Sequence, residues 1–157
     1  MQWSKLRSTV RALICEELRQ RIDFHATSYR NSHDEAEKVW ITIDGETILT
    51  ASWYHHQWHG WPRDNKGRLD HQSKFPGGID KAKDEVHLPQ EVGDVLRAYV
   101  DMPIDVAIES SNPLMRALSI IDRRVGKRRL EAIKISENDH SLVREFYRLR
   151  RESVNQP

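Results

Sequence analysis

Apolar residues recur along this chain with two different periods, and the change of period predicts where helix gives way to strand. At the N-terminus the spacing is helical and predicts a helix from Trp3 to about Arg19. The apolar face of this helix carries Trp3, Leu6, Val10, Leu13 and Leu18. From residue 21 to residue 29 the period becomes two, which predicts a strand. One face of the strand carries Ile22, Phe24 and Ala26.

A β-hairpin is predicted next, because Asp44-Gly45 separates two strand-like runs, Val39–Ile43 and Glu46–Trp53. With a two-residue turn, Ile41 would lie opposite Ile48 and Trp40 opposite Leu49. Both faces of the hairpin are then partly apolar. We therefore expect a helix against one face and the Trp-rich segment that follows the hairpin against the other.

An irregular centre and a group of helices are predicted for the rest of the chain. Residues 54–78 combine glycine, proline and polar side chains, which disfavours regular structure. Helices are predicted around residues 79–86, over 92–99, around 104–108 and after a cap at Asn138 or Asp139. The last of these helices has an apolar face of Leu142, Phe146 and Leu149. The predicted fold class is α+β, with an N-terminal helix, a small antiparallel sheet of about three strands and C-terminal helices.

The segment from Ser111 to Leu130 carries the most complete local signals. Asn112 suits the cap of a helix and Pro113 its first position. The apolar stripe that follows consists of Leu114, Leu118, Ile121 and Val125. Gly126 predicts the end of this helix in a left-handed conformation. Basic residues gather around that end, more of them than the helix dipole explains: Arg123, Arg124, Lys127, Arg128 and Arg129.

The same segment carries a family resemblance. The runs Asn112-Pro113, Arg116-Ala117-Leu118 and Asp122 to Leu130 resemble the C-terminal signature, NPxxRALxxxDRRVGKRRL, of an uncharacterised family of small bacterial proteins. The opening run Met1 to Arg7 and the strand Trp40 to Ile43 resemble the N-terminal half of that family. The resemblance implies a single bacterial domain and assigns no activity.

Composition and charge indicate one cytoplasmic domain. A chain of 157 residues is long enough for a single hydrophobic core. The 25 Lys and Arg residues are balanced by 24 Asp and Glu residues, so the molecule as a whole has no attraction for nucleic acid or acidic lipid. The one cysteine, Cys15, excludes an internal disulfide and fits a reducing compartment and a place in the core. No apolar run is long enough to span a membrane, so no membrane association is expected.

A metal site is considered because three histidines, His55, His56 and His59, lie within five residues. Neutral imidazole is a good ligand for zinc, nickel or copper. The spacing would bring His55 and His59 together only on a helix, whereas a predicted strand precedes them and Gly60 follows. We therefore predict no cofactor and keep a metal-dependent enzyme as the third hypothesis.

The aromatic residues of the same segment support a different hypothesis. Trp58 and Trp61 offer large, stiff contact surfaces, and such residues dominate the binding energy of protein interfaces. Nucleophile elbows, dinucleotide-binding glycines and paired cysteines do not occur in the sequence. The preferred hypothesis is a non-enzymatic interaction protein that contacts another protein through Trp58 and Trp61.

Nucleic-acid binding is the second hypothesis and rests on charge patterning. Lys127, Arg128 and Arg129 could join Arg144 and Arg148 of the last predicted helix in one positive surface that contacts phosphates. Interleaved glutamates would dilute this field, and no recognised nucleic-acid motif accompanies it. The sequence leaves the oligomeric state and the identity of the partner open.

Overall fold

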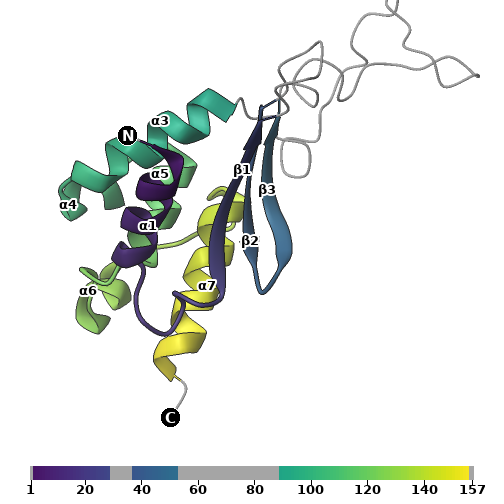
Figure 1. The fold of residues 1–157 in the computed structure, drawn as a ribbon. Helices are drawn as coiled ribbons and strands as arrows, with labels where there is room; N and C mark the ends of the chain where they lie inside the picture. The colour runs from purple at the N-terminus through teal and green to yellow at the C-terminus, as the bar shows by residue number, and fades with distance from the viewer. Residues whose placement is uncertain (1, 29–36, 53–88, 156–157) are drawn as a thin grey trace, which may run out of the picture.

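An N-terminal helix, an antiparallel sheet and a group of C-terminal helices make up the fold, which confirms the α+β prediction (Figure 1). The computed structural model describes residues 2–28, 37–52 and 89–155. Its elements follow in this order: α1 (Trp3–Leu13), β1 (Ile22–Ser28), β2 (Glu37–Ile43), β3 (Glu46–Ser52), α3 (Pro89–Asp101), α4 (Ile104–Ile108), α5 (Pro113–Ile120), α6 (Lys127–Ala132) and α7 (Ser141–Asn155). The helix predicted around 79–86 and the irregular centre at 54–78 lie outside the described residues.

The three strands form one antiparallel sheet in the order β1-β2-β3. Asp44 and Gly45 make the predicted hairpin turn and both have positive φ, 51° and 85°, as a two-residue turn between twisted strands requires. One face of the sheet packs on the helices, which Figure 1 shows gathered on one side of it. Ile22, Phe24 and Ile41 on this face are fully buried, whereas Ala26 is exposed.

The hairpin register differs by one residue from the prediction. Thr42 lies opposite Thr47, but a bulge beyond this pair places Ile41 opposite Leu49 and Trp40 opposite Thr50. Leu49 thereby joins Ile41 on the buried face, together with Ala51. The pairings of Ile41 with Ile48 and of Trp40 with Leu49 are wrong, because a regular ladder would have turned a threonine into the core in place of Ala51.

Helix α1 ends at Leu13, six residues before the predicted end at Arg19. Ile14 is extended, and the backbone beyond it pairs with the segment after α5. The Cys15 N–H donates to the Ile121 carbonyl at 2.9 Å, and the Arg123 N–H donates to the Leu13 carbonyl at 2.8 Å. The long-range hydrogen bonds replace further helical ones, which the local apolar spacing could not reveal. Cys15 is buried, as expected, although it follows the helix.

Helix α5 starts as predicted and ends early. The Asn112 side chain accepts a hydrogen bond from the Met115 N–H at 3.0 Å, and Pro113 occupies the first turn. The helix stops at Ile120, and Gly126 is not its left-handed end. With φ −75° and ψ 169°, Gly126 is instead the extended residue that precedes α6. Lys127, Arg128 and Arg129 therefore begin a new helix.

The remaining helices agree with the prediction except at one cap. Helices α3 and α4 cover the predicted segments, and α4 has the predicted bounds. At the start of α7 the His140 ring accepts the Leu142 N–H at 3.0 Å, where Asn138 or Asp139 was expected to cap. Asp139 accepts the Ser136 N–H and pairs with Arg116. None of the helices in the described ranges has the length and apolar character needed to cross a membrane.

Candidate functional site

A hollow in the surface beside α6 collects the basic residues that the sequence singled out. Its volume is about 580 Å³, and its lining residues are Arg124, Gly126, Lys127, Arg128, Arg129 and Ala132. We call it the basic hollow. The fully buried Leu130 fixes α6 to the core, which turns the neighbouring Lys127, Arg128 and Arg129 outward. Among the described lining residues every charged side chain is a cation, and such a surface is suited to binding anions.

A buried carboxylate holds one wall of the basic hollow in place. Asp122 is fully buried and accepts hydrogen bonds from Arg124 Nε at 3.0 Å, from Arg124 Nη2 at 2.8 Å and from the Arg124 backbone N–H at 2.8 Å. Arg124 Nη1 also donates to the Met102 carbonyl at 3.1 Å. The hydrogen bonds to Asp122 raise the pKa of the Arg124 guanidinium, so its charge persists at every ordinary pH. This charge is offset by Asp122, and Arg124 therefore shapes the hollow more than it adds free charge.

Tyr99 completes the buried cluster from α3. Its hydroxyl hydrogen-bonds Asp122 and lies 3.1 Å from the Leu118 carbonyl, while the Arg124 guanidinium lies 5.8 Å from the centre of its ring. Burial, together with Asp122, raises the pKa of the Tyr99 hydroxyl, which stays protonated. The cluster ties α3 and α5 to the loop that leads into α6, so it sets the position of the basic hollow.

The cations of the hollow differ in how far they are neutralised. Lys127 and Arg128 are exposed, and neither forms an ion pair within the part of the chain that the structure describes. Arg129 pairs with Asp105 of α4 at 3.1 Å, but both side chains are largely exposed, so the pair contributes little. Within the described part of the chain, two charges without an ion pair and one weakly paired charge are thus available to a ligand.

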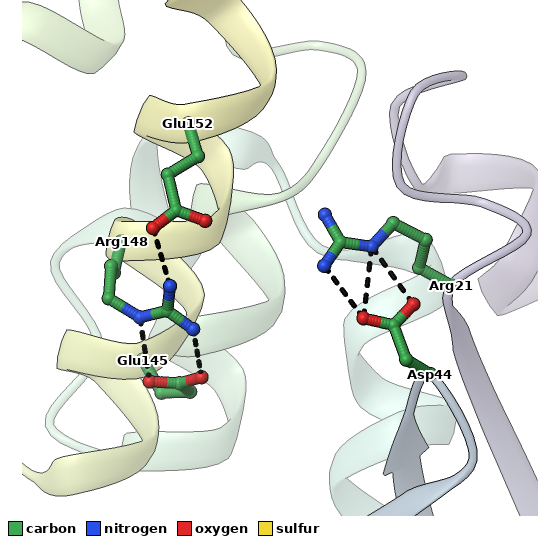
Figure 2. Close-up of polar contacts among 5 residues, drawn as sticks. All are labelled: Arg21, Asp44, Glu145, Arg148 and Glu152. Atoms are coloured by element: carbon green, nitrogen blue, oxygen red, sulfur yellow. Dashed lines mark hydrogen bonds and ion pairs between the residues drawn. The ribbon is translucent and has the colours of Figure 1, made fainter.

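Arg148 belongs to a separate network, as Figure 2 shows. It pairs with Glu145 at 2.6 Å and also with Glu152, both on α7. This network lies near the hairpin turn, where Arg21 pairs with Asp44 at 2.7 Å and experiences the charges of Glu152 and Arg148. The structure thus brings Lys127, Arg128 and Arg129 together and leaves Arg148 among acidic partners.

The other candidate residues from the sequence lie elsewhere on the fold or outside the described residues. Arg144 is exposed on α7. Trp58, Trp61, His55, His56 and His59 lie outside the described residues. Within the described ranges, no three His, Cys, Asp or Glu side chains group closely enough to hold a metal ion. The outer sheet face carries Trp40, which stacks on His25 at a ring distance of 4.9 Å.

Sequence reasoning missed the parts of the site that come from distant segments. Tyr99 and Asp122 are 23 residues apart, and the contact between them was not predicted. One signal was available: Asp122 directly follows Ile120-Ile121, of which Ile121 belongs to the apolar stripe of the predicted helix. A carboxylate at such a place is buried only with partners, so it predicts a nearby donor without identifying it.

The chain belongs to the SF0329 protein family, whose family model matches residues 2–151. This match confirms membership of an uncharacterised family, as the resemblance at both ends of the chain implied. No curated protein and no solved structure matched the chain.

Proposed function

We propose that this SF0329 protein is a small interaction protein of the bacterial cytoplasm, without a catalytic role, which binds an acidic segment of another protein in the basic hollow. One observation carries the proposal: Lys127 and Arg128 are exposed without ion pairs in the described structure, on a hollow whose lining charges are all positive. Carboxylates of a partner would provide the missing counter-charges.

The distribution of charge favours an acidic protein segment over nucleic acid. Phosphate-backbone binding gains affinity from many cations spread along a strand. Here the free cations of the hollow are confined to a helix of 6 residues, and Arg148 is already paired with Glu145 and Glu152. The net charge of the chain is only +1, so long-range attraction to a polyanion is weak.

Trp58 and Trp61 remain in this proposal as a second contact with the same partner. They were singled out because tryptophan dominates the binding energy of many interfaces. Replacing both by Ala should weaken capture of the partner and leave the far-ultraviolet circular dichroism spectrum unchanged.

The first test is direct binding of two model polyanions, measured by fluorescence anisotropy at low and at physiological salt. One probe is a labelled hexaglutamate peptide and the other a labelled oligothymidine. We expect the peptide to bind and the double variant Lys127→Ala, Arg128→Ala to weaken this binding about tenfold, because it removes both free cations.

The matched control removes two exposed cations elsewhere, Lys5→Ala with Arg144→Ala. It should change peptide affinity by no more than about twofold, since isolated surface charges contribute little. Tighter binding of oligothymidine than of the peptide, weakened by the Arg144 substitution as well, would overturn the proposal in favour of nucleic-acid binding. Absence of peptide binding at low salt would overturn it outright.

A further inference from the structure

A second hollow lies beside α6 and shares part of its lining with the basic hollow. Its volume is about 490 Å³, and its lining residues come from α4, α5, α6 and the segment that follows: Asp105, Ile108, Glu109, Arg116, Arg129, Ala132, Ile133 and Lys134. We call it the α4–α6 hollow. Arg129 and Ala132 line both hollows, so the two hollows adjoin.

The α4–α6 hollow differs from the basic hollow in having an apolar part. Ile108 and Ile133 are both half-buried, and Ala132 lies between the two hollows. Its charges are of both signs: Asp105 pairs with Arg129, Arg116 pairs with Asp139 and donates to the Lys134 carbonyl at 3.2 Å, and Glu109 and Lys134 are exposed. An anionic group thus gains less binding free energy here than at Lys127 and Arg128, and an apolar group gains more.

We infer that the α4–α6 hollow receives an apolar side chain of the same acidic segment whose carboxylates occupy the basic hollow. The inference rests on the proposed function and names the partner's sequence character: a cluster of acidic residues with one aliphatic residue beside it. Charge complementarity places the carboxylates at Lys127 and Arg128, and the half-buried Ile108 and Ile133 offer the aliphatic residue an apolar contact surface.

The length of α6 sets the spacing within that segment. Its 6 residues span roughly 9 Å at the usual rise of an α-helix. An extended peptide advances about 3.3 Å per residue, so the aliphatic residue lies about three positions from the acidic cluster. Binding in this form uses few contacts on a small surface, which suits a transient interaction.

The test uses labelled peptides that carry three glutamates, a Gly-Ser spacer and then either Leu or Ala, in both chain directions. We expect the Leu peptide to bind about tenfold more tightly than its Ala counterpart, because the leucine side chain is transferred from water into the α4–α6 hollow. Equal affinity of the two peptides overturns the inference and leaves the proposed function standing. Failure of both to bind overturns both.

Two substitutions on the same helix provide the matched comparison. Ile108→Thr removes part of the apolar lining and should reduce the difference in affinity between the Leu and Ala peptides, with the Ala peptide unaffected. Val106→Thr changes the neighbouring side chain, which is 55% exposed and does not line the hollow, and should preserve the tenfold difference. A tenfold difference that is undiminished in Ile108→Thr counts against the inference.

Nuclear magnetic resonance of the isoleucine methyl groups tests the inference on the unaltered chain. The Leu peptide should shift the methyl signals of Ile108 and Ile133 and leave that of the buried Ile14 unchanged. Leucine-dependent shifts confined to other isoleucines would assign the aliphatic residue to a different place and overturn the inference.

Discussion

Asp122 is the single residue on which the position of the candidate site depends most. A fully buried carboxylate is costly unless it is paired and hydrogen-bonded, and here Tyr99 and Arg124 supply the partners. Removing one partner from such a cluster leaves the charge of the remaining residue uncompensated. The cluster therefore matters for stability because its disruption would leave a buried charge without a partner. It also holds Arg124 in its orientation.

Asp122→Asn should lower the free energy of unfolding by about 3 kcal/mol, because the Arg124 guanidinium loses its counter-charge and meets an amide N–H₂ group. Tyr99→Phe removes only the hydroxyl hydrogen bond and should cost about 1 kcal/mol. Urea denaturation followed by circular dichroism measures both effects.

Asp94→Asn is the control for this comparison. Asp94 pairs with Arg97 at 2.7 Å on the exposed side of α3, and its side chain is 76% exposed. This substitution should change stability by less than about 0.5 kcal/mol. If Asp122→Asn were equally mild, the buried cluster would not hold the loop that leads into α6.

Among the elements, the hairpin turn depends most strongly on a glycine. Gly45 has φ 85°, a region that side chains with a Cβ rarely adopt, whereas Gly126 has φ −75° and open space around it. Gly45→Ala should therefore lower the unfolding free energy by about 1 kcal/mol or more, as measured by urea denaturation.

Gly126→Ala serves as the matched substitution. The added methyl group meets nothing within 4 Å and the backbone is extended, so stability should stay within about 0.5 kcal/mol of the parent protein. A larger loss at Gly126 than at Gly45 would contradict the conformations described for these two glycines.

The elements were predictable where neighbouring residues determine them. The Asp44-Gly45 turn, the Asn112 cap and the short helix α4 all follow from residues a few positions apart. The ends of α1 and α5 did not, since backbone hydrogen bonds between residues 13–15 and 121–123 replace helical ones. The bulge also depends on burial, because it places Ala51 in the core beside β2.

For the molecule as a whole, the sequence located the basic residues but not the surface that they form. Lys127, Arg128 and Arg129 were proposed, and the structure places them on one hollow. Their grouping with Arg148 depended on which glutamates lie near each arginine, and that is a property of packing. Net charge and spacing along the chain carry no information about such pairing.

Several carboxylates distributed over the fold have pKa values below their usual range. Hydrogen bonds from Arg21 lower the pKa of Asp44, and hydrogen bonds from Arg148 lower that of Glu145 (Figure 2). The Ser136 backbone N–H, with Arg116, lowers the pKa of Asp139. A carboxylate with a depressed pKa in the folded state contributes stability that is present above its unfolded pKa, near 4, and is lost as pH falls through the folded value.

Stability should accordingly be constant from about pH 7 to about pH 5 and fall steadily towards pH 3, as these groups are protonated and their ion pairs are lost. Urea denaturation at pH 7, 5 and 3 measures the change. Asp139→Asn should be less stable than the parent at pH 7 and lose less stability on acidification, because the pair with Arg116 is already absent. An unfolding midpoint that does not fall between pH 5 and pH 3 would mean that these ion pairs do not stabilise the fold.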